Sequence, residues 1–228
     1  MARGTSLYFL RHGDSVANAK GLLAGQTPGI DLTAKGRDQI TQIGEYFASY
    51  PIDVALTSPL ERTVQSAALF LATHNCDAQI DPSFIEMNYG YWSNKKLKAL
   101  ASKPEWKIVQ GSPQTFTFPK GESFLSAWTR IVNRINFLVS DKNFAGKKIL
   151  VVSHGDIIKM AITYALDLPL SSFQRFRVDT ASISQINYIG NQFSVSQLNF
   201  NLHNHSTVFR NFTLGGEVHK SSGVRKLK

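Results

Sequence analysis

The sequence has little cysteine, few acidic residues and no long apolar run. Its one cysteine, Cys76, excludes an intrachain disulfide framework and a zinc site built from several cysteines. No segment approaches the roughly 18 to 20 consecutive apolar residues that cross a bilayer, and the apolar run at residues 7–10 is too short for a signal-peptide core. These absences predict a cytoplasmic protein that does not enter the membrane.

Acidic residues are outnumbered, with 16 Asp and Glu against 25 Lys and Arg and a formal net charge of +9. Part of this excess lies in residues 201–228, and no basic stripe interleaved with aromatics is visible, so nucleic acid is not an expected partner. A chain with 43% hydrophobic residues can bury a sizeable core. We expect one domain over residues 1–200, followed by a basic, flexible tail over 201–228.

Short apolar runs alternate with helical patterns along the chain. Runs at 6–10, 54–57 and 149–153 have the composition of buried parallel strands. Apolar residues spaced three and four apart predict helices over 34–49, directly after a Ser58 cap, over 124–138 and over 156–166, and two more strands are expected over 182–188 and 192–198. This alternation predicts an α/β layered fold.

Residues 87–120 do not continue the alternation. They read as a lid-like insertion with a short helix, and such segments commonly shape the entrance to a site. The lysines within residues 95–107 either attract anionic substrates or form a solvated face, and the sequence leaves both readings open.

Basic and imidazole side chains gather where the predicted strands end. Arg11, His12 and a glycine follow the first strand, His154 with Gly155 follows a later one, and Arg62 comes shortly after a third. Open α/β sheets bind ligands at the carboxyl ends of their strands. Each tripeptide alone is readily a chance match. Together, two planar guanidinium groups and two imidazoles suit a doubly negative phosphoryl group.

These motifs also carry a family resemblance. Leu-Arg-His-Gly at 10–13, followed by Asn18, resembles the opening of the histidine phosphatase superfamily, which contains the cofactor-dependent phosphoglycerate mutases and related phosphatases. The resemblance covers residues 6–200 and continues in the family's order through residues 58–67, 86–92, 121–123 and 151–155. It implies a phosphoglycerate mutase-like three-layer α/β/α sandwich with a mostly parallel central sheet.

The resemblance also implies roles. His12 takes the phosphoryl group as a phosphohistidine, Arg11, Arg62 and His154 hold its oxygens, and Glu86 is the proton donor and acceptor. Asn18 and Gly155 are implied as further substrate contacts. Charge stabilisation by these groups needs no metal and no cofactor.

Three acidic positions have competing readings. Glu86 is this catalytic acid, a surface carboxylate or a partner for one of the lysines, and Asp14 is a competing acid. Glu122 and Ser123 either contact the substrate directly or form the start of the helix that follows them.

Phosphatases and mutases of this family share the phosphohistidine and differ in what receives the phosphoryl group. The spacing of 68 positions from Glu86 to His154 resembles that of phosphatase branches, since the mutases typically carry a longer insertion that excludes water. Segments 23–32 and 173–182 are instead similar to an actinobacterial subgroup whose members are named as phosphomutases.

We therefore expect a metal-independent phosphomonoesterase that acts on a small phosphorylated metabolite. The alternatives are a phosphoglycerate mutase, which would use 2,3-bisphosphoglycerate, and a non-catalytic protein that binds a phosphorylated ligand. The sequence leaves the choice between a monomer and a homodimer open.

Overall fold

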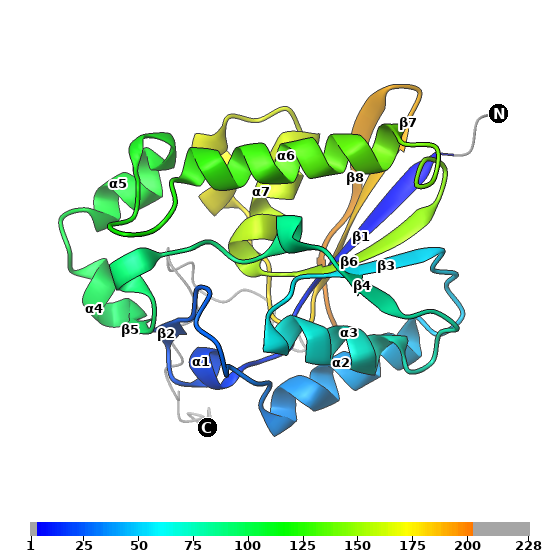
Figure 1. The fold of residues 1–228 in the computed structure, drawn as a ribbon, viewed down its shortest axis with the longest axis horizontal. Helices are drawn as coiled ribbons and strands as arrows, with labels where there is room; N and C mark the ends of the chain where they lie inside the picture. Colours follow the sequence, from blue (N-terminus) through cyan, green and yellow to red (C-terminus); the bar gives the residue numbers. More distant parts are fainter. Residues whose placement is uncertain (1–3, 203–228) are drawn as a thin grey trace, which may run out of the picture.

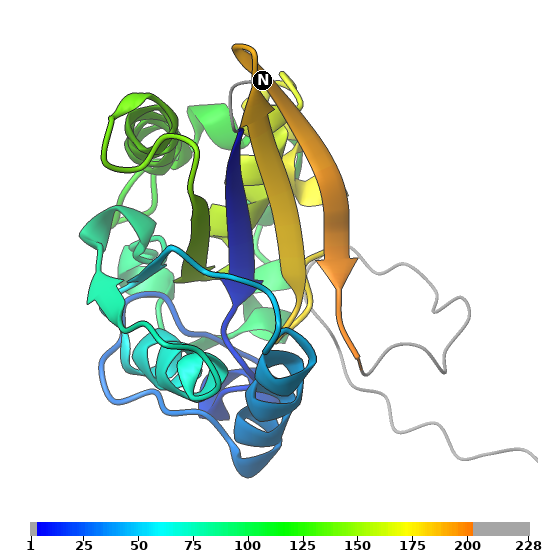
Figure 2. The same cartoon turned by 90° about the vertical axis from the view of Figure 1, so that its right-hand side faces the viewer.

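The computed structural model describes residues 4–202 and is built around a six-stranded sheet (Figure 1). The strands lie in the order β4-β3-β6-β1-β7-β8. The first four are parallel, and the last two run antiparallel to their neighbours (Figure 2). Their bounds are Thr5–Arg11 (β1), Val54–Thr57 (β3), Ala78–Ile80 (β4), Lys148–Ser153 (β6), Ile183–Ile189 (β7) and Gln192–Phe200 (β8). The predicted strands and the mostly parallel sheet are confirmed.

Helices cover both faces of the sheet. Leu7 and Phe9 point to the face covered by α6 (Phe124–Ser140) and α7 (Gly155–Ala165), in the larger of two core clusters. The intervening residues of β1 point to the opposite face, against α2 (Ala34–Tyr46) and α3 (Glu61–Leu71). Since successive strand residues face opposite sides, an apolar run of this kind is buried on both. The predicted three-layer α/β/α sandwich is confirmed.

Helix boundaries differ from the predictions by one to three residues, and α2 and α3 show two of these differences. Helix α2 ends at Tyr46, three residues before the predicted end. Helix α3 does not start at a Ser58 cap, and that prediction was wrong. The backbone N–H of Ser58 instead donates to Val152, which extends the strand ladder, and the helix begins after Leu60. The Ser58 side chain is thus left for another contact.

The insertion carries its own small structure. It contains α4 (Leu97–Ala101), α5 (Trp106–Gly111) and short 3₁₀ turns, and its strand β5 (Lys95–Lys96) pairs with β2 (Leu22–Leu23). That pairing ties the insertion to the segment after α1 (Val16–Ala19), beside the carboxyl ends of the parallel strands (Figure 1). The expected short helix is present, with a second one after it.

Close backbone packing holds the loop after β1 against α2. A Cβ atom at Gly36 would lie 2.0 Å from the carbonyl oxygen of Asp14, and one at Gly13 would lie 2.4 Å from the carbonyl oxygen of Gly36. Glycine at both positions therefore permits the approach.

Two further predictions concern membrane crossing and the C-terminal tail. Among the helices of residues 4–202, none combines the length and apolar character needed to cross a bilayer. Nearly all of the predicted tail, residues 203–228, lies outside the described residues.

Candidate active site

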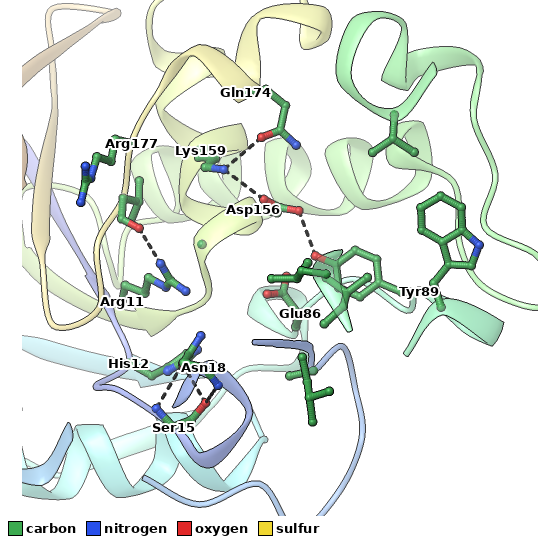
Figure 3. Close-up of a pocket in the computed structure, with 18 of the residues that line it drawn as sticks. Arg11, His12, Ser15, Asn18, Glu86, Tyr89, Asp156, Lys159, Gln174 and Arg177 are labelled. Atoms are coloured by element: carbon green, nitrogen blue, oxygen red, sulfur yellow. Dashed lines mark hydrogen bonds and ion pairs between the residues drawn. The ribbon is translucent and has the colours of Figure 1, made fainter. Parts of the chain in front are cut away.

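A cavity of about 320 Å³ opens at the carboxyl ends of β1, β3 and β6 (Figure 3). The sheet order explains this convergence, because β6 lies between β1 and β3. His12 continues the ladder by donating its backbone N–H to Ser153, next to His154. The rings of the two histidines lie 5.3 Å apart between centroids. Six of the predicted site residues line the cavity: Arg11, His12, Asn18, Arg62, Glu86 and Gly155.

His12 is buried and its tautomer is fixed. Its Nδ1 atom lies 2.7 Å from the carbonyl oxygen of Gly13, which can only accept, so Nδ1 carries the proton. Burial, together with the charges of Arg62 and Arg11, holds the pKa of His12 well below its usual range. The ring is therefore neutral at physiological pH, with the lone pair on Nε2, as a nucleophile requires.

His154 does not itself line the cavity but lies directly beside His12, fully buried. Its Nε2 atom lies 2.7 Å from the hydroxyl oxygen of Ser58. Its Nδ1 atom is buried and has no hydrogen-bond partner within residues 4–202. Burial and then Arg62 lower the pKa of this ring well below its usual range, so it is also neutral.

The two arginines present unpaired donors. Arg11 donates from Nη1 to the carbonyl oxygen of Val178 at 2.6 Å, and Arg62 donates from Nη2 to that of Gly25 at 2.8 Å. Nε of Arg11 and both Nε and Nη1 of Arg62 are buried without a partner in the described part of the chain. Buried donors are rarely left unsatisfied in folded proteins. A bound anion with several oxygens would satisfy them and balance both charges.

Glu86 lies opposite these cations in the loop after β4. Burial and then the nearby carboxylate of Asp156 raise its pKa to about 7, against the opposing effect of Arg62. One carboxylate oxygen accepts from the backbone N–H of Met87 at 3.0 Å. A carboxyl group with a pKa near 7 can both give and take a proton at neutral pH.

The ion pair of Arg130 and Glu122 holds the backbone on both sides of Glu86. Arg130 donates to the carbonyl oxygens of Ser83 and Ile85, and it also pairs with Glu122 at 3.2 Å. Glu122 in turn accepts from the backbone N–H of Asn88 at 2.8 Å. The chain before Glu86 and the chain after it are therefore held by one pair of side chains.

Glu122 and Ser123 do not line the cavity. Ser123 is the N-cap of α6 and accepts from the backbone N–H of Ser126, so the helix-start reading describes it. Asp14 accepts from the hydroxyl of Thr33 at 2.9 Å and also lies outside the lining.

Asn18 and Gly155 both line the cavity. The side-chain oxygen of Asn18 accepts from the backbone N–H and the hydroxyl of Ser15, which leaves its amide NH₂ for a ligand. A Cβ at Gly155 would lie 3.5 Å from the guanidinium carbon of Arg11, so the backbone passes close to that side chain.

Several lining residues were not singled out from the sequence. Tyr89 donates to Asp156 at 2.9 Å, and Asp156 pairs with Lys159 one turn later on α7 (Figure 3). The i, i+3 spacing of acid and base directly after His154-Gly155 was a usable signal for this pair. Arg177 and Asp179 come from the segment before β7, whose return to the site no local pattern indicates.

Within the described residues, no group of three or more His, Cys, Asp or Glu side chains is arranged to hold a metal ion. The two histidines at the cavity, His12 and His154, are instead buried near Arg11 and Arg62, and the positive charge of these arginines disfavours a bound cation.

Comparisons with known proteins match this fold and site. The family model described as the histidine phosphatase superfamily (branch 1) matches residues 7–201. A protein of Cronobacter sakazakii named Probable phosphoglycerate mutase GpmB is 30% identical over 185 residues, which are 80% of this chain and 84% of that protein. The crystal structure of the alpha-ribazole phosphatase of Shigella flexneri has a TM-score of 0.77 and 27% identity, over 86% of this chain and 96% of that one. A mycobacterial glucosyl-3-phosphoglycerate phosphatase, at 20% identity and a TM-score of 0.76, shares the fold. The chain therefore belongs to the histidine phosphatase superfamily.

Proposed function

We propose that this chain is a metal-independent phosphomonoesterase that acts on a small phosphorylated metabolite through a phosphohistidine at His12. The observation that carries the proposal is the fixed tautomer of His12, whose Nδ1 is held by Gly13 while Nε2 is left as a nucleophile. The unpaired donors of Arg11 and Arg62 beside it support a phosphoryl group as the electrophile.

In the first step, Nε2 of His12 attacks phosphorus and the bond from phosphorus to the alcohol oxygen breaks. Protonated Glu86 gives its proton to that departing oxygen, which its pKa of about 7 allows at neutral pH. Arg11, Arg62 and Nδ1–H of His154 hold the transferring oxygens, whose charge spreads in the transition state. The amide of Asn18 and the backbone of Gly155 are further contacts, the latter at the N-terminus of α7.

In the second step, the Glu86 carboxylate takes a proton from water. The water oxygen bonds to phosphorus, the bond from phosphorus to Nε2 breaks, and its electron pair returns to the imidazole. Inorganic phosphate leaves, and Glu86 is protonated again for the next cycle.

A phosphoglycerate mutase is the second candidate, because the curated relatives carry that name. It would use the same phosphohistidine but pass the phosphoryl group to a bound phospho-acid. The site offers a nucleophile, an acid and an anion clamp together, which a protein that only binds a phosphorylated ligand does not need.

Product analysis separates these candidates. Purified protein is incubated without metal with a phosphomonoester panel, and separately with 3-phosphoglycerate and a trace of 2,3-bisphosphoglycerate, following free phosphate and 2-phosphoglycerate. We expect phosphate release that His12→Ala abolishes and that His74→Ala retains, since His74 lies outside the cavity. Faster formation of 2-phosphoglycerate than of phosphate would make the chain a mutase, and an active His12→Ala would remove the phosphohistidine.

A further inference from the structure

The cavity has a second half that the proposed chemistry does not use. Beyond Arg11, His12 and Arg62, where the phosphoryl group is proposed to bind, the wall is apolar and mostly aromatic. Its residues come from the β2 segment, the insertion and the start of α6: Leu23, Trp92, Trp106, Val109, Phe118 and Phe124. Trp92 stacks on Trp106 with ring centroids 6.2 Å apart and an interplanar angle of 16°. Phe118 meets Trp92 edge-on at 5.4 Å and Tyr89 at 5.0 Å, so the rings form one continuous wall.

The two further cations among the described residues that line the cavity, Lys159 and Arg177, are each paired with a carboxylate. Lys159 pairs with Asp156 at 3.4 Å and donates to Gln174 at 3.1 Å (Figure 3). Arg177 pairs with Asp179 at 2.6 Å. Each cation therefore has its own carboxylate. Among the cations of residues 4–202 that line the cavity, Arg11 and Arg62 form no ion pair. Both lie where the phosphoryl group is proposed to bind.

One polar atom in the apolar half lacks a partner. The side-chain oxygen of Gln110 on α5 is buried and accepts no hydrogen bond from the residues that the structure describes. That oxygen is an acceptor, so an N–H or O–H group of a substrate would satisfy it, whereas an ionised carboxylate, which offers only acceptors, would not.

From these three observations we propose that the site selects phosphomonoesters whose alcohol carries an uncharged, planar apolar group, such as an aromatic ring, and rejects those with a second anionic group. This inference rests on the proposed function for the position of the phosphoryl group. A ring stacked in the wall removes apolar surface from water and gains edge and face contacts with the aromatic side chains. A carboxylate there would lose its hydration without gaining an unpaired cation.

The size of the cavity fits the same class of substrate. A volume of about 320 Å³ lies near the lower end of the range for small-molecule sites, roughly 300 to 1,000 Å³. It suits a monophosphate of one ring or ring system rather than a phosphorylated protein.

Two non-hydrolysable ligands test the selection directly. In 3-phenylpropylphosphonate and 3-carboxypropylphosphonate the same chain links a phosphonate to either a ring or an anion. Isothermal titration calorimetry on the full chain measures both. We expect the phenyl compound to bind at least tenfold more tightly. Equal affinities, tighter binding of the carboxylate, or binding of neither compound would overturn the inference.

Variants of α5 localise the effect to the wall. Trp106→Ala is expected to reduce the preference for the phenyl compound to less than threefold. Ile108→Ala is the matched control, since Ile108 lies on the same helix, is 43% exposed and does not line the cavity. Gln110→Lys places an unpaired cation in the apolar half and should raise the affinity for the carboxylate compound at least tenfold. This rise in affinity for the carboxylate compound can be measured whether or not Trp106→Ala folds. A Gln110→Lys protein that shows no such rise would contradict the inference.

Hydrolysis of 2-phenylethyl phosphate and glycerol 3-phosphate separates the inference from the proposed function. Phosphate release from both esters at similar kcat/KM, without a preference in the phosphonate titrations, leaves the phosphomonoesterase standing and removes the selection. A clear preference in the titrations without any phosphate release keeps the selective site and removes the proposed hydrolysis.

Discussion

Nε2 of His154 lies 2.7 Å from the hydroxyl oxygen of Ser58, and both groups are fully buried. Since the pKa of His154 is depressed, the ring carries one proton. The ring holds its proton on Nδ1 only when Nε2 accepts from the Ser58 hydroxyl, and the proposed role of His154 as a donor to a phosphoryl oxygen requires that arrangement. This hydrogen bond therefore joins the residue that follows β3 to the residue that follows β6.

Removal of this contact should weaken catalysis without removing it. We expect Ser58→Ala to lower kcat/KM about tenfold or more, because the proton of His154 is then free to sit on the wrong nitrogen. Steady-state kinetics on one ester measures the loss. Ser112→Ala is a control, since Ser112 is exposed and lies outside the cavity. An unchanged kcat/KM in Ser58→Ala would show that the hydroxyl does not orient the ring.

The pH dependence of the rate should report Glu86. This group must be protonated to serve as the acid, so kcat/KM for an alkyl phosphate should fall as the pH rises above about 7, the pKa of Glu86. Asp156 helps to raise that pKa, so Asp156→Asn should move the falling limb to lower pH. Asp38→Asn, which changes an exposed carboxylate on α2, should leave it in place. A limb that moves upward in Asp156→Asn would contradict the assignment.

The ion pair of Arg130 and Glu122 should matter through Glu86. We expect Arg130→Met to lower kcat/KM at least tenfold for 2-phenylethyl phosphate, whose alcohol leaves only with a proton. For p-nitrophenyl phosphate, whose phenolate leaves unaided, the loss should be less than threefold. Arg134→Met is the matched control, one turn later on α6, because Arg134 pairs with Asp81 away from the cavity. Equal losses on both substrates would indicate general damage rather than misplacement of the acid.

Inorganic phosphate should stabilise the protein through the unpaired arginines. At a concentration about 100-fold above its Kd, a ligand that binds only the folded state adds about 2.7 kcal/mol. That corresponds to a rise of roughly 5 to 10 °C in the Tm of a protein of this size. Arg62→Met should abolish the rise, with chloride at matched ionic strength as the reference.

Without phosphate, Arg62→Met should have a Tm equal to or above that of the unmodified chain. Arg62 is 1% exposed, and burial already lowers the pKa of its guanidinium group. Replacement of a buried unpaired charge by an apolar side chain of similar length removes that desolvation cost. A fall of several degrees would mean that Arg62 contributes to the fold through its contact with Gly25.

The parts of the fold and site that the sequence predicts are those with local signals. Buried strands appear as continuous apolar runs, and the carboxyl ends of β1 and β6 carry the Arg-His-Gly and Ser-His-Gly signatures. The boundary of α3 was missed because Ser58-Pro59 is a typical helix start, while the strand ladder to Val152 is a tertiary contact. A hydrogen bond to another strand leaves no trace in the local pattern.

The apolar half of the cavity was missed for a related reason. Trp106 and Gln110 lie in or just after residues 95–107, whose lysines were open to two readings, attraction of anions or a solvated face. Those lysines are exposed and none lines the cavity. Which face of α5 turns inward depends on the pairing of β2 with β5 and on the aromatic side chains behind it. Pairing over two residues is too short to be read from periodicity.

The pairing of β2 with β5 also bears on how such an enzyme diversifies. The histidines are presented by adjacent core strands, whereas the aromatic wall stands on an insertion that is joined to the neighbouring loop through a short ribbon of its own. Mutations that remodel the insertion can therefore alter which alcohols are accepted while the bond-making apparatus is inherited intact. New specificities can therefore arise through substitutions in one peripheral segment, without an intermediate that has lost the catalytic residues at the strand ends.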